Sequence, residues 1–419
     1  MAVGFEFATG WDIFKIKDGM NLPVTGVRTE ADLNHYTTGY PKAAVVRGGY
    51  GWKMTVDGTE IEYVVNELEE SSGGENQLTF VMADLKRFVT MMNARNAQSF
   101  LTAGDFPPGT FRAPNDRFVI HIKNDLRFKN IEAIPQVTGG VRLARVRKLW
   151  RLLADPTSAA ARQFFADSPG GQPIYSSMIN QITLRPSQLL DSNWPTHKPG
   201  ARLRGLVTLI ATYLRRGYSP EQHGVGAVKY LFILMSRTKF SALVDNLPHD
   251  ERTHYKAAKD DWVNYICKDV MSKVTGMPPT GVDPDGVVIE RKVTDRGNLP
   301  VPLTLPITRK DWLKGMLKGR DLLSAEANPL GGADDATWRD SNPELGHRLR
   351  GLAGLGDKMD RLTYKGVSNK AAIIEFRARQ AALEYKLWPD YAQRMHRFFT
   401  AINEGDRYGL IDLDAPALV

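Results

Sequence analysis

The sequence predicts an α+β protein: an antiparallel sheet lined by carboxylates, with a large helical insertion and a C-terminal helix. Three observations lead to this fold class. Strand-like alternation fills much of the first 135 residues, helical periodicity dominates from about residue 141, and one more strand-like run precedes an amphipathic helix near the end of the chain. Early and late strands can therefore belong to one sheet, with the helical segment inserted between them.

The first 140 residues are expected to supply most strands of this sheet. Apolar residues alternate with polar ones in five runs, which cover residues 3–16, 42–49, 50–56, 59–65 and 117–124. Residues 75–96 repeat apolar positions at i, i+3 and i+4, as an amphipathic helix does. Gly- and Pro-rich turns such as GDFPPGT join these elements.

Residues 141–275 are interpreted as a helical region, and residues 276–419 as a loop-rich region that returns one strand to the sheet. The helical patterns cover residues 141–155, 202–217, 227–248 and 259–274. The stretch 276–345 carries many prolines and glycines, which is typical of loops around a hairpin. The returning strand covers residues 371–379, and an amphipathic helix follows at 389–405.

The composition fits a globular protein with an anionic partner. The chain has 419 residues, of which 42% are hydrophobic, and its 55 basic and 47 acidic side chains give a net charge of +8. A positive charge suits nucleotides, nucleic acids or phosphorylated ligands. Residues 54–85 contain eight Asp or Glu and no Lys or Arg, so this segment either faces solvent or gathers cations.

The sequence shows no segment for membrane insertion or secretion. No apolar run approaches the roughly 18–20 residues of a membrane span, and the N-terminus lacks the basic and apolar parts of a secretion signal. We therefore expect a soluble protein that is cytoplasmic or delivered by a Sec-independent secretion system. The single cysteine, Cys267, excludes an intramolecular disulfide and a cysteine-based zinc site, and it is expected to be an apolar filler on a helix.

Several common catalytic motifs are missing from the sequence. GVGAVK at 224–229 lacks the spacing and the hydroxyl of a phosphate loop, and GLAGLGDK at 351–358 is no dinucleotide fingerprint. His249 and His254 lie five residues apart rather than at the four-residue step of a zinc-binding helix. With no GxSxG motif either, the chain offers no Ser, Cys or His arrangement for nucleophilic catalysis.

Carboxylates on predicted strands are the remaining candidates for chemistry. Glu6 lies in VGFEFAT, and Glu60 and Glu62 alternate in DGTEIEYVV. Glu375 precedes Arg377 by two residues in AAIIEFRAR. Residues two apart share one face of a strand, and acids on strands can converge on Mg²⁺ beside an arginine that binds phosphate. Taken singly, each acid is more often a structural residue on a solvated strand face than a functional one, and Glu375 with Arg377 is also consistent with a surface ion pair.

The N-terminal strand carries its acid between two aromatic residues. Phe5 and Phe7 share one face of residues 3–16, and Glu6 lies on the other. We expect the aromatic face to pack on helices while the opposite face lines a polar site.

Four segments resemble carboxylate–amine ligases of the glutamine synthetase fold, in particular the amidoligase branch related to glutamate–cysteine ligase. They are, in chain order, VGFEF, WKMTVDGTEIEYVV, PQVTGGVRL and IIEFRAR. In that family an early G-x-E-x-E strand, a later strand with W, DG and E, and a terminal EFR strand supply metal-binding glutamates and a phosphate-contacting arginine. All of them lie on an antiparallel sheet.

Carried over by this resemblance, Glu6, Glu62 and Glu375 are the metal ligands. Arg377 and Glu62 become the catalytic residues, and Arg377 also contacts the nucleotide. Gln136 falls where the family has a central strand that lines the nucleotide or metal site, so it is a second nucleotide-binding residue.

The resemblance implies an ATP- and Mg²⁺-dependent ligase that forms an amide through an acyl phosphate. Its substrates would be a small molecule or peptide with a carboxylate, and an amine. Ala8 stands where the family has a second acid, which leaves open a reduced metal requirement or a member that binds without catalysing. The basic helix start with Arg142, Arg145 and Lys148 either guides the nucleotide or an acidic substrate, or is a solvated helix face.

Other segments, including GLVTLIATYLRRG, are similar to uncharacterised bacterial proteins encoded near contractile injection systems. This similarity implies at most an effector role. It leaves open an effector or toxin that keeps the fold for binding a protein partner, or an enzyme that transfers a nucleotidyl or phosphoryl group onto a protein. A nucleic-acid partner is disfavoured because basic and aromatic residues are rarely interleaved. Uncovered strand edges leave room for a homo-oligomer.

Overall fold

The fold is known from a computed structural model of the chain. It describes residues 2–23, 26–112, 115–154, 199–217, 234–238, 243–244, 247–265, 288–294, 300–308, 363–364, 367–368, 371–377 and 382–404. Cys267 and the glycine-rich segments 224–229 and 351–358 lie outside the described residues.

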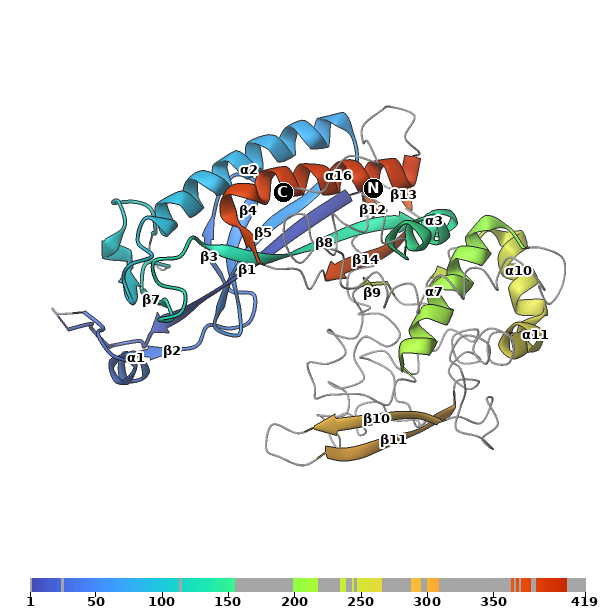
Figure 1. The fold of residues 1–419 in the computed structure, drawn as a ribbon, viewed down its shortest axis with the longest axis horizontal. Helices are drawn as coiled ribbons and strands as arrows, with labels where there is room; N and C mark the ends of the chain where they lie inside the picture. The colour runs from blue at the N-terminus through green and yellow to red at the C-terminus, as the bar shows by residue number, and fades with distance from the viewer. Residues whose placement is uncertain are drawn as a thin grey trace.

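An antiparallel sheet that combines strands from both ends of the chain forms the centre of the fold (Figure 1). Its main path runs in the order β3 (Val45–Gly48), β4 (Trp52–Asp57), β5 (Glu60–Glu69), β1 (Ala2–Ile16), β8 (Glu132–Arg142), β14 (Ala371–Arg377) and β9 (Leu234–Ser236). Short strands pair beside this path, namely β2 (Thr37–Thr38), β6 (Phe100–Thr102), β7 (Phe118–His121) and β15 (Leu383–Glu384). The predicted α+β class is confirmed, and early and late strands do share one sheet.

Two long helices, α2 (Ser72–Asn93) and α16 (Trp388–Glu404), lie side by side across one face of this sheet (Figure 1). The other described helices are α1 (Glu30–Tyr36), α3 (Leu143–Ala154), α7 (Ala201–Gly217), α10 (His249–Ala257) and α11 (Lys259–Asn264), with 3-10 turns η1 (Ala103–Asp105) and η5 (Tyr385–Leu387). A hairpin of β10 (Val288–Thr294) and β11 (Pro300–Thr308) agrees with the hairpin expected in 276–345. A second small hairpin joins β12 (Thr363–Tyr364) and β13 (Val367–Ser368).

One predicted element is wrong. The helical pattern of residues 227–248 contains Leu234–Ser236, which form strand β9 because they pair with the edge of β14. Non-local pairing has overridden a local apolar pattern that is compatible with either state. The described elements between Leu143 and Asn264 are otherwise helices, and the insertion of the whole segment 141–275 stays a prediction.

Strand β1 shows why an acid can stand between two aromatic residues. Phe5 and Phe7 are 1% and 0% exposed, whereas Glu6 and Ala8 on the opposite face are half-buried. The Phe7 ring stacks on Trp388 at the start of α16, with ring centroids 4.5 Å apart and planes 13° apart. The aromatic face therefore packs on a helix, as expected.

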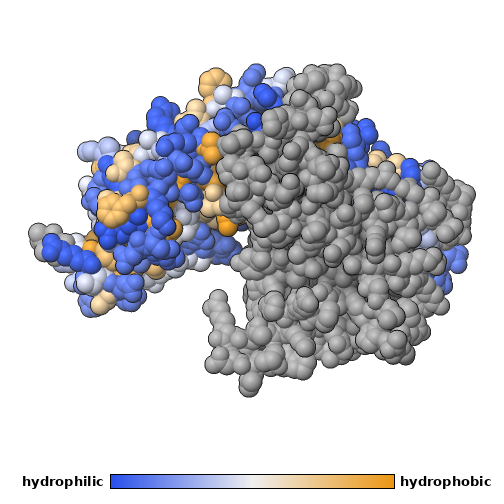
Figure 2. Space-filling model, in the orientation of Figure 1, coloured by the Kyte–Doolittle hydropathy of each residue, from blue (hydrophilic) through white to orange (hydrophobic). Residues whose placement is uncertain are grey.

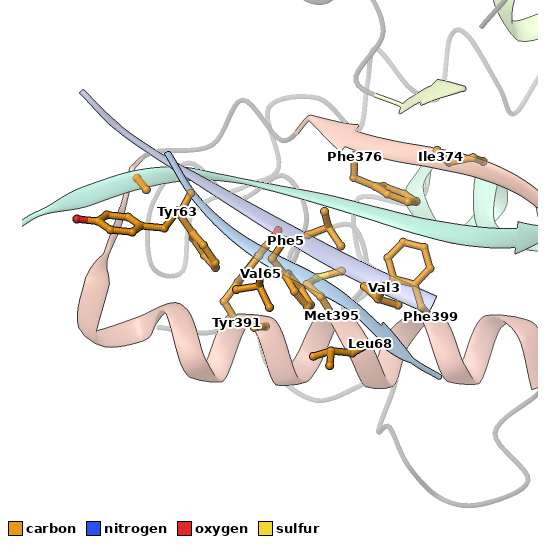
Figure 3. Close-up of a cluster of buried hydrophobic side chains, with 14 of the residues drawn as sticks. Val3, Phe5, Tyr63, Val65, Leu68, Ile374, Phe376, Tyr391, Met395 and Phe399 are labelled. Carbon is orange, nitrogen blue, oxygen red and sulfur yellow. The ribbon is translucent and has the colours of Figure 1, made fainter. Parts of the chain in front are cut away.

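Side chains from strands of the sheet and from α16 fill the space between the sheet and this helix (Figure 3). Val3 and Phe5 of β1 and Val65 of β5 point toward the helix, where Met395 and Phe399 meet them. Each buried side chain of this size contributes about 2 kcal/mol to folding. The first strand of the chain and its last described helix therefore belong to one core.

Helix α16 is held on strand β8 by a close contact at Gly139 and by the hydrogen bonds of Asn403. A Cβ at Gly139 would lie 2.5 Å from the Phe399 ring, so only glycine lets the helix come this near. The fully buried Asn403 donates its Nδ2 to the Gly140 carbonyl and to Glu70 Oε2, at 2.8 Å each. Its Oδ1 accepts the backbone N–H of Arg142 at 3.0 Å.

The described surface seen in Figure 2 is mainly hydrophilic, with hydrophobic side chains scattered over it. The exposed large hydrophobic residues of the described chain are Val45, Tyr50, Phe80, Phe128 and Ile134. Single exposed apolar side chains of this kind are ordinary in folded proteins. None of the described helices has the length and apolar character needed to cross a membrane.

Candidate functional site

Three predicted site residues form one row across neighbouring strands. Glu6 on β1 lies directly opposite Gln136 on β8, and Gln136 lies opposite Arg377 on β14. Residues directly opposite each other in antiparallel strands share one face of the sheet. The row therefore lies on the face turned away from α2 and α16. The Arg377 side chain lies outside what the structure describes, so only its position in the row is known.

Glu62 is the diagonal neighbour of Glu6 on the same face. Glu6 pairs with Val64 of β5, and Glu62 follows two residues away along that strand, opposite Ala8. Diagonal neighbours of this kind have Cα atoms about 7 Å apart, which long side chains can bridge. Both carboxylates are half-buried.

The electrostatics of this pair appear in the pKa of Glu62, which is raised from 4.5 to about 7. Loss of solvent contact is the largest cause, and the negative charges of Glu6, Asp57 and Glu60 raise it further. Lys42 opposes the shift, and its Nζ lies 2.7 Å from Asp57 Oδ1. At neutral pH the Glu62 carboxyl is thus poised between its neutral and charged forms, and a nearby cation would favour the charged one.

Gln136 adds an unsatisfied acceptor to the row. Its Oε1 atom is buried and has no hydrogen-bond donor within the described part of the chain. A buried amide oxygen without a partner is costly, on the order of 1–3 kcal/mol, and is therefore an indication of a missing donor. Water or a ligand N–H beside Glu6 would satisfy it.

Glu375 does not join Glu6 and Glu62. It is fully buried opposite Thr138 of β8, and its Oε2 forms an ion pair with Nε of Arg237, just beyond strand β9. Three strand spacings separate β5 from β14, which is about 14 Å, so Glu62 and Glu375 cannot both reach one cation. Among the described residues no group of three or more His, Cys, Asp or Glu could hold a metal ion. The expectation that all three glutamates share one cation is therefore corrected.

Arg142 also lies away from the row. It is exposed at the end of β8, six residues beyond Gln136, which corresponds to about 20 Å along the strand. On the helix that follows, Arg145 is half-buried and Lys148 is exposed. Because Gln136 lies opposite Glu6, the same distance of about 20 Å along β8 separates Arg142 from the Glu6 and Glu62 carboxylates.

The sequence did not indicate Arg237, nor the contact that Glu60 makes beside the site. Arg237, the partner of Glu375, was hidden because its segment was predicted as a helix. Glu60 was noticed only as the neighbour of Glu62, yet its Oε1 accepts the Gly10 backbone N–H at 2.6 Å and lines a pocket next to Ala8. The irregular pairing of β1 with β5 between Ala8 and Asp12 creates this contact, and no sequence pattern predicts such an irregularity.

Comparison of the chain with known protein families, with curated proteins and with solved structures found no match. The geometry of this sheet face is therefore the basis on which a function can be inferred. This sheet face carries two adjacent carboxylates, Glu6 and Glu62, and the pKa of Glu62 is near neutrality. Beside them lie the unsatisfied amide oxygen of Gln136 and the β14 position that Arg377 occupies.

Proposed function

We propose that the protein is an ATP- and Mg²⁺-dependent carboxylate–amine ligase. The observation that carries the proposal is the adjacency of Glu6 and Glu62 on one sheet face, in register with Gln136 and Arg377. These are four of the residues that the resemblance to amidoligases selects, and they come from four separate strands.

The residues present fit a magnesium ion held together with a nucleotide. Mg²⁺ is usually bound by one or two carboxylates, while substrate phosphates and water supply the other oxygens. Glu6 and Glu62 meet this requirement without Glu375. Their mutual repulsion, which helps to raise the pKa of Glu62, would be relieved by a divalent cation. The free Oε1 of Gln136 supports a ligand donor at the same place.

The chemistry assigns a role to each side chain. When bound, ATP with Mg²⁺ would supply the phosphoryl group that converts a substrate carboxylate into an acyl phosphate. Arg377 would bind the phosphate oxygens, since a guanidinium makes paired hydrogen bonds to such groups. Glu62 would take a proton from the substrate ammonium, which frees the lone pair of the amine for attack on the acyl carbon. A C–N bond then forms, the C–O bond to phosphate breaks, phosphate leaves with that electron pair, and the second proton lost by the nitrogen passes to the departing phosphate.

A second candidate is an effector that keeps this face for binding, or for nucleotidyl or phosphoryl transfer onto a protein. The observation that favours it is Ala8, which lies opposite Glu62 where the family pattern has another acid. With Glu375 occupied by Arg237 as well, fewer carboxylates are available than the resemblance implies.

The first test is calorimetric titration of the whole protein with Mg²⁺ and a non-hydrolysable ATP analogue. We expect binding by the wild type and at least tenfold weaker binding by Glu6→Gln and Glu62→Gln, because each removes one of the two anionic ligands. Glu69→Gln, at an exposed position at the end of β5, is the matched control and should bind normally. Melting curves would show that the variants remain folded.

The outcomes separate the two candidates. No binding of the analogue by the wild type overturns both enzyme proposals. Binding without ATP turnover, when many carboxylates and amines are supplied, overturns the ligase and favours the effector. A mass increase of a co-incubated protein by a nucleotidyl or phosphoryl group would identify transfer.

A further inference from the structure

A pocket of about 220 Å³ lies at one end of the same sheet face. Its charged lining comes from Glu60, Glu132 and Lys129, and its apolar lining includes Leu126 and Ile134. Pockets for drug-sized ligands measure about 300–1,000 Å³, so the occupant of this one is small.

Gly10 creates the space between the two acids. Glu60 and Glu132 stand on β5 and β8, the two strands that flank β1, and Gly10 of β1 lies between them without a side chain. Gly10 has φ of +72°, which glycine adopts without strain. Its N–H holds the Glu60 carboxylate at 2.6 Å. A Cβ at this position would come within 3.3 Å of Leu126 Cδ1 and narrow the pocket.

Two charged side chains of this pocket, Glu132 and Lys129, differ from the neighbouring charges because they are available to a ligand. Asp12, next to the pocket, is already engaged by Lys123 Nζ at 3.1 Å and by the Thr59 hydroxyl at 2.8 Å. Within the described chain, by contrast, neither Glu132 nor Lys129 has an ion-pair partner. Two acids and one base of this kind, around a partly apolar space, are complementary to a ligand that carries both a positive and a negative charge.

We infer that this pocket binds a small molecule with a primary ammonium and a carboxylate, of the size and chemistry of a free amino acid. The ammonium lies between Glu60 and Glu132 above Gly10, and the carboxylate pairs with Lys129. The ligand's aliphatic part contacts Leu126 and Ile134.

The identification of this ligand as the amine substrate rests on the proposed ligase function, but its binding does not. Ala8 both lines the pocket and lies opposite Glu62, so the ammonium would be next to the carboxyl that accepts its proton.

The test measures binding alone, without ATP or Mg²⁺. Calorimetry of the whole protein would compare glycine, leucine and lysine with their N-acetyl and amide forms, each of which lacks one charge. We expect free amino acids to bind and both capped forms to bind at least tenfold more weakly. Glu132→Gln and Lys129→Met, both at exposed positions, should each weaken binding of the free amino acid at least tenfold. Glu69→Gln and Arg112→Met are exposed charge controls that should leave it unchanged.

Three results would overturn the inference: no binding of any amino acid, binding of the amide form as tight as that of the free amino acid in the wild type, or equal affinities in all variants. The second result would identify a site for simple amines. Failure of the ligase gives a different pattern, because amino acids would still bind while ATP turnover is absent. Turnover that is unaffected by Lys129→Met, without amino-acid binding, would overturn the pocket alone.

Discussion

At the scale of single residues, Glu62 couples the site to pH. Its pKa is about 7 in the folded chain against 4.5 as the ordinary value, so between these pH values the folded state keeps a proton that the unfolded state releases. The stability that this proton contributes is fully present below pH 4.5 and is lost as the pH rises through 7. Above pH 7 a charged, half-buried carboxylate is left beside Glu6.

Glu62→Gln should remove this dependence. We expect the free energy of unfolding of the variant to exceed that of the wild type at pH 8 by about 1–2 kcal/mol, a value reduced for screening by water at a half-buried site. At pH 4 the two proteins should be equally stable. Urea denaturation at both pH values measures the difference. Glu69→Gln, which changes an exposed acid, should follow the wild type, and a variant that is less stable than wild type at pH 8 would contradict the assignment.

The burial of Glu375 and its ion pair with Arg237 indicate a structural role, which a substitution of Glu375 would test. Glu375→Gln leaves the largely buried Arg237 guanidinium without its charged partner, so we expect a loss of about 3 kcal/mol in unfolding free energy. Replacement of both residues by methionine should restore most of this loss, because no buried charge then remains. Asp18→Asn, which breaks an exposed pair with Lys15 at 3.0 Å, should cost less than about 1 kcal/mol. Equal stability of Glu375→Gln and wild type, with lost Mg²⁺ binding, would instead return Glu375 to the metal site.

These residues show what sequence reasoning can reach. The face of Glu6 followed from alternation with Phe5 and Phe7, because side-chain direction along a strand is a local property. The partner of Glu375 did not follow, because Arg237 lies 138 positions earlier in the chain and only the pairing of β9 with β14 brings it close. Long-range partners of a charged side chain have no local signature.

At the scale of elements, amphipathic patterns located the long helices and strands. Helix α2 and strand β1 both expose one polar face and bury one apolar face, so their periods of 3.6 and 2 can be read directly. The short strands β9, β6 and β15 have two or three residues each, too few for a period to be recognised. Strand β9 lies in a long apolar run, and an apolar run of that length usually indicates a helix.

The order of the strands in the sheet cannot be predicted from local sequence patterns or from composition. Glu6 stands beside Gln136 because β1 pairs with β8, and nothing in the two segments themselves selects this register. The expectation that they meet came from the resemblance to amidoligases. The pocket at Gly10 could not be predicted for the same reason, since its walls come from β1, β5, β8 and the loop before β8.

At the scale of the whole molecule, the ends of the chain stabilise each other. Strand β1, formed by the first residues, is the central strand of the main path, and α16, near the C-terminus, covers it. The sheet that carries Glu6 and Glu62 therefore cannot complete the burial of its apolar face, part of which α2 covers, until α16 is in place. We infer that the described core folds and unfolds as one unit.

Trp388, fully buried at the start of α16, tests this cooperativity. Trp388→Ala removes the ring that stacks on Phe7 and the Nε1–H that donates to the Leu383 carbonyl at 2.8 Å. We expect a loss of about 3–5 kcal/mol in unfolding free energy, with helix and sheet signals melting in a single transition. Trp388→Phe keeps a ring against Phe7 and should lose clearly less. Two separate transitions, in which the β1 amides stay protected from hydrogen exchange after α16 has unfolded, would show that the sheet stands without its C-terminal helix.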